Sequence, residues 1–301
     1  MRVGLVGTGY WAAEVHAPAV VAAGHELTAV WGRDAGRAEA LASRHEAGAF
    51  AGEDRLDPFL DGVDALTFAV PPDVQAPIAV RAAQAGRHLL LEKPTGLSVE
   101  QADGVADAVE AAGVASVVFF TARHTPAVAD WLDGLRARGG WTGAHGAWLG
   151  SIFTDGSPFG ASPWRHEHGG LWDVGPHALS VLVGALGPVT SVSAVRGPGD
   201  TVHLVLRHGD GQDAPSSTAS VSLTVPPDAA ALRCEVYGQH GWTSIPADHG
   251  TTAVEALGHA LRALEQAARG GQPHPCDARF GADVVRVLAA AQEQLDQNTP
   301  G

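Results

Sequence analysis

The chain has 301 residues, 45% of them hydrophobic and 17% charged, which is enough to form two domains with separate cores. Its formal net charge of -14 repels nucleic-acid phosphates and anionic lipid headgroups, which argues against nucleic acids and membrane surfaces as partners. We therefore expect a small-molecule partner or another protein.

Signals of compartment are few. The N-terminal MRVGLVGTGYW is interrupted by glycines, unlike a signal peptide, and no stretch has the roughly 18 consecutive apolar residues of a membrane span. Cys234 and Cys276 are far apart and lack the spacing of metal ligands, so we expect neither a disulfide framework nor a zinc site. These features predict a protein of the reducing cytoplasm.

The first expected element is the short apolar strand RVGLVG, which leads through Gly7, Gly9 and Ala12 into an alanine-rich helix that ends near residue 23. This order of strand, glycine turn and helix gives structural context to a GxGxx[GA] match. Glycines there let the backbone approach a pyrophosphate at the helix N-terminus. The other residues of the turn complete this part of the predicted cofactor site: Thr8, Tyr10 and Trp11.

Four further strands are expected at residues 26–31, 64–70, 87–92 and 114–120, with helices between them. Alternating strands and helices predict a parallel sheet that binds its ligand at the carboxyl ends of the strands. Three loops then meet at one edge: 7–12, 70–75 and 92–96. Pro71 of the second loop and Glu92 and Lys93 of the third join the predicted cofactor site.

The second strand ends in WGRD, where an NAD enzyme usually places an acid for the ribose 2′-hydroxyl. Gly32 occupies that position and leaves room for a 2′-phosphate, which the guanidinium of Arg33 binds well. We expect NADP as the cofactor, with NAD as the alternative. The competing interpretation is that Arg33 only opens a surface loop.

Lys93 comes directly after the expected strand at residues 87–92, in the sequence EKP, and Pro94 restricts its backbone to extended conformations. At the ligand edge of the sheet, its ammonium could polarise a substrate hydroxyl or lower the pKa of a neighbour. The alternative is a solvated surface lysine, which is the common fate of this residue type.

Residues 166–177, HEHGGLWDVGPH, concentrate titratable groups among glycines and a proline. Pro176 favours the first turn of a helix, with Asp173 as its N-cap and His177 on the same face. The pattern suits proton transfer, but it also suits a capped helix with a polar first turn. The preceding His166, Glu167 and His168 make a poor metal set, so we expect loop or substrate-rim residues and no metal.

The C-terminal region predicts another sheet. Residues 218–225, TASVSLTV, alternate hydroxyl and apolar side chains as a half-buried strand does, and TVHLVLRH and LRCEVYGQ predict two more strands. The hydroxyl face suits either subunit packing or solvent. Two helices are expected at residues 251–269 and 277–296.

The motifs GTGYWA, EKP and GGLWDVGPH occur in this order, with WR at Trp164 and Arg165 and HPCDARFGADVV near the end. In this the chain resembles the glucose-fructose oxidoreductase and inositol dehydrogenase (Gfo/Idh/MocA) family. The resemblance implies an α/β fold with a Rossmann domain over 1–120 and an α/β domain over 121–301. The second domain would have an open, mostly antiparallel sheet, through which the family commonly dimerises.

The resemblance also implies hydride transfer between nicotinamide and a sugar or cyclitol carbon, with Lys93, Asp173 and His177 as the catalytic residues. His177, near a helix N-terminus that disfavours imidazolium, would accept the proton. Lys93 would polarise the reacting oxygen, and Asp173 would bind a substrate hydroxyl or orient the histidine. The remaining predicted substrate contacts are Arg123, Trp164, Arg165 and Trp172.

Two positions depart from the family pattern. Gln75 replaces a frequent histidine, and Ser180 replaces a frequent acid, so both are expected to tune substrate contacts. Two functions follow: an NADP-preferring oxidoreductase acting on a sugar, cyclitol or polyol, or a catalytically silent nucleotide-binding sensor. Retention of all three catalytic residues favours the enzyme. A homo-oligomer, dimer or tetramer, is expected.

Overall fold

The computed structural model describes residues 1–160, 162–247 and 250–298, which form two compact units. The first unit comprises Met1–His124 and Gly250–Asp283. The second comprises the described residues of Thr125–His249 and Val284–Gly301. The first segment of this unit thus ends four residues past the domain boundary expected at residue 120. The unit also includes a second segment from late in the chain.

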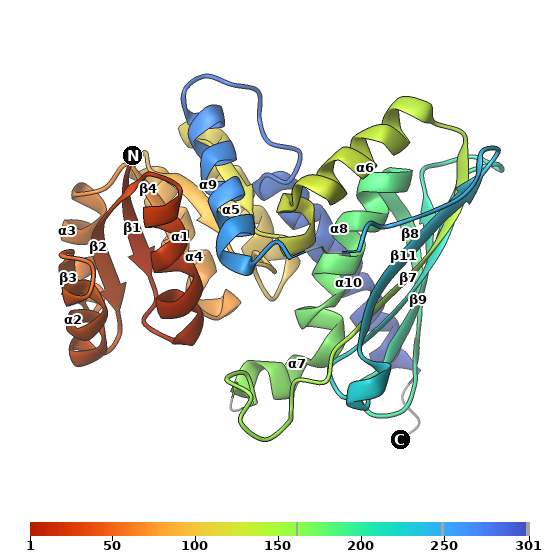
Figure 1. The fold of residues 1–301 in the computed structure, drawn as a ribbon, viewed down its shortest axis with the longest axis horizontal. Helices are drawn as coiled ribbons and strands as arrows, with labels where there is room; N and C mark the ends of the chain where they lie inside the picture. The colour runs from red at the N-terminus through yellow and green to blue at the C-terminus, as the bar shows by residue number, and fades with distance from the viewer. Residues whose placement is uncertain (161, 248–249, 299–301) are drawn as a thin grey trace. The chain divides into compact units, whose positions relative to one another are not determined.

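The first unit contains a six-stranded parallel sheet in the order β3-β2-β1-β4-β5-β6 (Figure 1). Its strands are β1 (Arg2–Val6), β2 (Glu26–Gly32), β3 (Gly48–Ala51), β4 (Ala65–Phe68), β5 (His88–Leu91) and β6 (Ser116–Val118). This is the strand order of a Rossmann fold, in which the switch in direction of winding next to β1 creates the ligand crevice. The predicted parallel sheet is confirmed, with β3 as an additional edge strand.

Helices cover both faces of this sheet. They are η1 (Ala12–His16), α1 (Ala17–Ala22), α2 (Ala35–Ser43), η2 (Glu53–Arg55), α3 (Leu56–Asp61), α4 (Pro72–Gln84), α5 (Val99–Ala112), η3 (Thr121–His124) and α9 (Ala253–Ala268).

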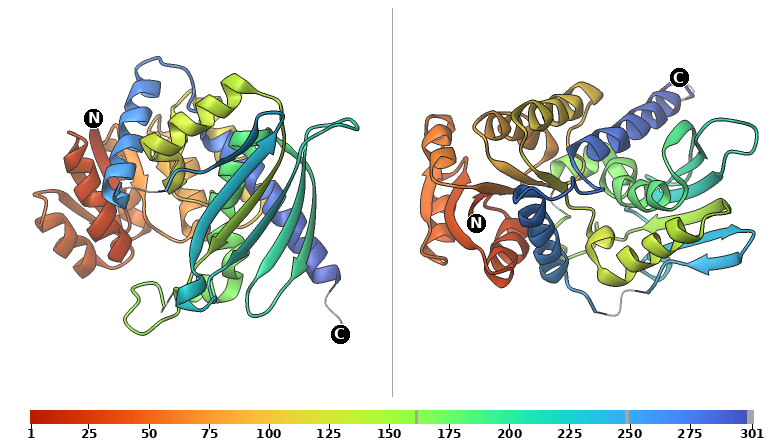
Figure 2. Two further views of the ribbon diagram at one scale, coloured as in Figure 1. Left: turned by 45° about the vertical axis from the view of Figure 1, so that its right-hand side comes forward. Right: turned by 90° about the horizontal axis from the view of Figure 1, so that it is seen from above.

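Helix α9 explains why a late segment belongs to the first unit. It lies beside α1 (Figure 2), and its apolar stripe is fully buried in the same core as Val3, Leu5 and Val20. That stripe consists of Ala256, Leu257, Ala260, Leu261 and Leu264. The spacing places all five on one helix face, so α9 buries apolar area that the sheet would otherwise expose.

The second unit contains a mixed sheet in the order β12-β11-β7-β10-β9-β8. Its strands are β7 (Trp141–Leu149), β8 (Val189–Arg196), β9 (Val202–His208), β10 (Ser216–Ser222), β11 (Ala231–Gly238) and β12 (Gly241–Ser244). All neighbouring pairs are antiparallel except β7 and β10, which are parallel. The expected open, mostly antiparallel sheet is confirmed.

The remaining helices are α6 (Pro126–Arg138), α7 (Pro163–Asp173), α8 (Gly175–Leu186), α10 (Ala278–Gln297) and the short η4 (Pro227–Ala229). Helix α10 begins in the first unit and ends in the second.

Helices α7 and α8 pack against β10. The predicted alternation along β10 holds for exposed Thr218 and buried Ala219 and Val221, but Ser222 is fully buried. Its buried hydroxyl donates a hydrogen bond to Asp200 Oδ1 at 2.6 Å. Among the described residues, no helix is both long and apolar enough for a membrane span.

Candidate active site

The glycine turn after β1 has the geometry that nucleotide binding requires. Gly7 has φ +129°, and a Cβ there would lie 2.4 Å from the carbonyl oxygen of Ala69, so only glycine fits. Its N–H donates to the Trp31 carbonyl at 2.8 Å, which ties the turn to the end of β2. At Gly9 a Cβ would meet nothing within 4 Å. The backbone of Gly9 is therefore open to an approaching phosphate group, as the motif predicts.

The other predicted cofactor residues lie on loops that follow parallel strands and so reach one edge of the sheet. Thr8, Tyr10 and Trp11 follow β1, and Arg33 follows β2. The rest follow β4 and β5: Pro71, Glu92 and Lys93. The structure therefore brings these predicted residues to the carboxyl edge, where Rossmann sheets bind ligands.

The end of β2 lacks an available acid in the ribose position. A Cβ on Gly32 would lie 2.6 Å from the Thr8 methyl group, so any side chain there would require the Thr8 side chain to move. The next acid, Asp34, caps α2 by accepting a hydrogen bond from Arg37 N at 2.8 Å. Arg33 is exposed between them. This edge therefore presents a guanidinium, with the nearest carboxylate engaged in helix capping.

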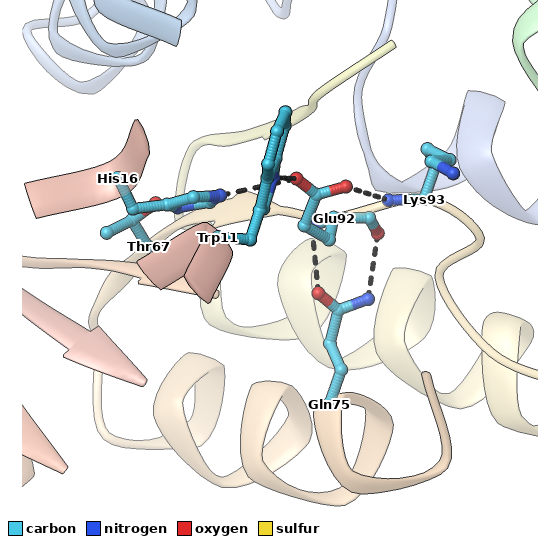
Figure 3. Close-up of polar contacts among 6 residues, drawn as sticks. All are labelled: Trp11, His16, Thr67, Gln75, Glu92 and Lys93. Carbon is cyan, nitrogen blue, oxygen red and sulfur yellow. Dashed lines mark hydrogen bonds and ion pairs between the residues drawn. The ribbon is translucent and has the colours of Figure 1, made fainter. Parts of the chain in front are cut away.

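The carboxylate of Glu92 contacts three residues near the nucleotide edge (Figure 3). Its Oε1 accepts hydrogen bonds from Trp11 Nε1 at 2.7 Å and from His16 Nε2 at 3.2 Å. Its Oε2 accepts one from the backbone N–H of Lys93 at 3.2 Å. The helix after the glycine turn and the loop that carries Lys93 are thus joined through one side chain.

His16 and Thr67 extend this network inward and were not predicted from the sequence. His16 is fully buried, and its Nδ1 lies 2.7 Å from Thr67 Oγ1. The tautomer with its proton on Nε2 donates to the Glu92 carboxylate and accepts at Nδ1 from the threonine hydroxyl. The one sequence signal was a histidine within an alanine-rich helix that packs on the sheet.

Gln75 holds the backbone of the same loop. Its Oε1 accepts from Glu92 N at 2.8 Å, and its Nε2 donates to the carbonyls of Glu92 at 2.8 Å and Pro94 at 3.3 Å. The side chain is fully buried, so its observed partners are backbone groups, whereas the sequence suggested a substrate contact. Glu92 and Gln75 together fix the backbone on both sides of Lys93. Lys93 is also the only lysine among the 301 residues.

In the second unit, a predicted substrate residue pairs with a predicted catalytic residue. Arg165 Nε donates to Asp173 Oδ2 at 2.9 Å, and the side chains are 21% and 8% exposed. The guanidinium also lies over the rings of Phe159 and Trp164, at 4.9 Å from each centroid. Arg165 therefore holds Asp173 in place, and the aromatic rings fix the arginine in turn.

The predicted N-cap role of Asp173 is wrong. Asp173 is the last residue of α7, and Val174 occupies the N-cap position of α8 without a side-chain cap. The reason is a break inside α7: Gly169 has φ 60°, and the helix renews at Gly170 and ends at Asp173. Of the two alternatives for residues 166–168, the loop is wrong because these residues are helical, and the substrate rim stays a prediction.

His177 lies in the first turn of α8, where Pro176 was expected to start a helix. Its carbonyl accepts a hydrogen bond from Ser180 Oγ at 2.8 Å. Ser180 is fully buried, so its observed role is within the helix, whereas a substrate contact was expected. The His177 side chain itself is half-buried.

The two remaining predicted substrate residues lie mostly inside their units. Trp172 is 5% exposed and its Nε1 donates to Gln292 Oε1 of α10 at 3.2 Å. Arg123 is 8% exposed, and its guanidinium lies 5.6 Å from the centroid of the Phe280 ring. Their roles toward a substrate stay predictions. Within the described residues, no three His, Cys, Asp or Glu side chains gather as a metal site would require.

Comparisons with known proteins agree with this architecture. The model of the oxidoreductase family with an NAD-binding Rossmann fold, GFO_IDH_MocA, matches residues 1–120. The rhizopine catabolism protein MocA of Rhizobium meliloti is 29% identical over 252 residues, which cover 78% of this chain and 77% of MocA. Levoglucosan dehydrogenase of Pseudarthrobacter phenanthrenivorans is 32% identical over 146 residues, which cover 46% of this chain and 36% of that protein.

Among solved structures, the WlbA dehydrogenase of Bordetella pertussis, in complex with NADH and UDP-GlcNAcA, superposes with a TM-score of 0.84. Its sequence identity is 21%, and the match covers 99% of this chain and 97% of WlbA, which shows a shared fold over both units. The family model places residues 1–120 in the Gfo/Idh/MocA family of oxidoreductases, the chain is similar to MocA over 252 residues, and both units share the fold of WlbA.

Proposed function

We propose that this oxidoreductase prefers NADP and transfers a hydride between nicotinamide and a hydroxyl or ketone carbon of a sugar, cyclitol or related polyol. The observation that carries the proposal is the Glu92 network, which holds the backbone N–H of the only lysine of the chain. A solvated lysine would need no such support. Residues 1–120 would supply most of the nucleotide site and residues 121–301 most of the substrate site.

The first unit fits a dinucleotide. The turn at Gly7 is closed to side chains and the backbone at Gly9 is open, which suits a pyrophosphate at the start of the following helix. Thr8, Tyr10, Trp11 and Pro71 would line the remaining cofactor surface. When bound, the nicotinamide supplies the hydride donor or acceptor of the reaction.

Preference for NADP is supported by the end of β2. An acid in place of Gly32 would require the Thr8 side chain to move, and the Asp34 carboxylate already accepts a helix N–H. The exposed Arg33 would bind a 2′-phosphate through its guanidinium. An NAD enzyme would instead need a carboxylate directed at the ribose hydroxyls.

The proposed chemistry divides among three side chains. During oxidation, His177 would take the hydroxyl proton, and during reduction it would return it. The Lys93 ammonium would stabilise negative charge that develops on the reacting oxygen. Asp173, whose Oδ2 already accepts from Arg165, would use its remaining acceptor capacity for a substrate hydroxyl or for His177.

A sugar-like substrate is supported by the relatives, since levoglucosan dehydrogenase and WlbA are both dehydrogenases named with sugar-derived compounds. Trp164 and Trp172 would offer aromatic surface to a sugar ring, with Arg123 and Arg165 as polar contacts. The products would follow from removal of one hydride and one proton from a carbinol, which leaves a ketone or lactone.

A homo-oligomer, dimer or tetramer, in the cytoplasm is part of the same proposal. The exposed side of the second sheet carries the large apolar residues Val195, Val205 and Trp242, each at least 55% exposed. Apolar groups spread over one sheet favour contact with a second copy. Light scattering that gives the 30.9 kDa mass of one chain would contradict it.

The decisive experiment is a tryptophan-fluorescence titration with NADPH and NADH, followed by turnover assays with a panel of sugars and polyols. We expect NADPH to bind at least about tenfold more tightly, or about 1.4 kcal/mol, and Arg33→Ala to remove this preference. The matched control is Arg44→Ala, which removes an exposed arginine at the C-terminal end of α2, the helix that follows Arg33. This variant should retain the preference for NADPH. Tighter binding of NADH would overturn the NADP preference alone.

The single lysine allows an independent test without mutation. An amine-selective reagent can label only Lys93 and the N-terminal amine, so mass spectrometry reports each separately. We expect NADP to slow labelling of Lys93 and to leave that of Met1 unchanged. Binding of nucleotide without any turnover across the panel would favour the silent sensor instead.

A further inference from the structure

The carboxylate of Asp200, in the loop between β8 and β9, joins three separate segments of the second unit. Its Oδ2 accepts from the backbone N–H groups of Gly170 at 2.8 Å and Leu223 at 2.9 Å. Its Oδ1 accepts from the hydroxyls of Ser222 and Thr224, both at 2.6 Å, and from Thr224 N at 3.2 Å. An acidic side chain with so many donors acts as a fixed joint between α7 and the end of β10.

The Asp200 carboxylate lies where the broken helix has backbone N–H groups without intrahelical acceptors. The break at Gly169 exposes N–H groups at the renewed helix start, where the ladder of intrahelical bonds has no acceptor. A residue at the break would normally cap them with its side chain, but glycine has none. Asp200 supplies the acceptor from another part of the chain, with a negative charge that suits a helix N-terminus.

Glycines allow the segments to approach closely. A Cβ on Gly170 would lie 2.6 Å from the Cα of Ser222, and one on Gly169 would lie 3.4 Å from the Cβ of Asp200. Gly199 has φ +64°, and a Cβ there would lie 2.6 Å from Thr224 Oγ1. The backbone of the renewed helix therefore rests directly on the end of β10.

The renewed helix leads directly to the proposed catalytic groups. Val174 N donates to the Gly170 carbonyl at 3.0 Å, so the turn that begins at Gly170 ends at Asp173. Helix α8 begins at Gly175 and carries His177 in its first turn. A displacement at Gly170 would thus move both Asp173 and His177.

We propose that Asp200 is a positioning residue that sets the places of Asp173 and His177 by capping the renewed helix at Gly170. This inference rests on the proposed function of these two side chains. Asp200 itself has no role in the chemistry, and its effect passes through the helix it caps.

The charge of Asp200 is consistent with this role. Burial raises the pKa of its carboxyl group, but hydrogen bonds from Ser222, Thr224, Leu223 and Gly170 lower the pKa by more, and the net shift is downward. The carboxylate is therefore ionised at neutral pH and accepts from all of its donors.

The test compares Asp200→Asn with the matched control Asp213→Asn, which changes an exposed carboxylate in the β9–β10 connection. Asparagine keeps the shape, but its amide NH2 faces donors in place of one oxygen. We expect turnover to fall about ten- to a hundredfold and the pH profile of kcat to shift, with nucleotide affinity unchanged. Thr224→Val, which removes one donor, should act in the same direction more weakly.

A readout independent of activity is hydrogen exchange in peptides that cover residues 170–178, measured against peptides of the Rossmann unit. We expect exchange at 170–178 to be faster in Asp200→Asn than in the parent. In Asp213→Asn it should be the same as in the parent. Unchanged exchange there would overturn the proposal, as would parental kcat and pH profile in a variant of lowered Tm. If the parent enzyme turns over no sugar, the proposed function fails, while the exchange result still decides whether Asp200 holds this helix.

Discussion

Lys93 and Asp173 are fixed in their units by different means. Around Lys93, the supporting groups come from the loops after the two strands that flank β4: Trp11 after β1 and Glu92 after β5, with Thr67 inside β4 itself. The sheet brings these loops together, whatever their sequences. The hydrogen bonds of Glu92 then require only side chains long enough to reach from one loop to the next.

Around Asp173, no such sheet edge exists. The carboxylate is held by Arg165 from the same interrupted helix, and the helix itself is held by Asp200 from a distant loop. The position of Asp173 thus depends on a few charged contacts and on glycines that permit close approach. We infer that the first region is robust because the fold defines it, and that the second is sensitive to single substitutions.

The largest expected effect falls on the second region. His177→Ala should lower kcat by about 10²- to 10⁴-fold, because general acid and base catalysis contributes about that much. Nucleotide affinity should change little, since the nucleotide edge belongs to the other unit. Steady-state kinetics and the fluorescence titration measure the two effects separately.

The control for this variant is His203→Ala, an exposed histidine on the sheet of the same unit that should leave kcat unchanged. Equal turnover in His177→Ala and parent would refute the assignment of the base. Loss of nucleotide binding along with turnover would show that the two regions are not separable in the way described above.

The next effect concerns the first region. Glu92→Gln should lower the free energy of unfolding by about 2–3 kcal/mol, because an amide cannot accept from Trp11, His16 and Lys93 at once and places a donor against donors. Urea denaturation measures the loss, and turnover should fall with it as the Lys93 backbone shifts. Glu39→Gln, on the exposed face of α2, is the control expected to match the parent. A parental stability for Glu92→Gln would mean that the network does not support the loop.

The contrast between the regions also explains what could be predicted from sequence. The strands β1, β2, β4, β5 and β6 and the glycine turn follow from local patterns, and their order alone brings Lys93 to the nucleotide edge. Strand β3, with the sequence GAFA, is short and rich in residues of low strand propensity, so no local signal marks it.

Long-range contacts account for the other misses. The partner of His16 is 76 residues away, and the acceptor for Gly170 N is 30 residues away, so neither bond leaves a trace in local spacing. Asp173 was placed as an N-cap because that position commonly caps a helix, yet the break at Gly169 moved the helix start. A backbone break that depends on a distant cap is therefore the feature that sequence patterns represent least well.

The smallest expected effect uses pH to separate the regions. His124 of the first unit is buried, and desolvation lowers its pKa to about 3, against the weaker opposing effect of its hydrogen bond to the Val118 carbonyl. Burial likewise lowers the pKa of the neighbouring His274 in the first unit. It also lowers the pKa of His208 in the second unit. Because the unfolded chain binds a proton near pH 6.5 and the folded state resists it down to about 3, stability falls as the pH drops through this window.

At pH 5 the contribution of His124 alone should be a loss of about 2 kcal/mol relative to neutral pH. Hydrogen exchange corrected for intrinsic rates should therefore show acid loosening around β5 and β6 before β9 and β10. His124→Gln should flatten the dependence in the first unit, while His240→Gln, an exposed histidine, should not. An unchanged slope in His124→Gln would mean that the acid sensitivity of the Rossmann unit arises elsewhere. It would also show that a parallel-sheet core tolerates protonation of this ring, which would extend its robustness from the site network to the core.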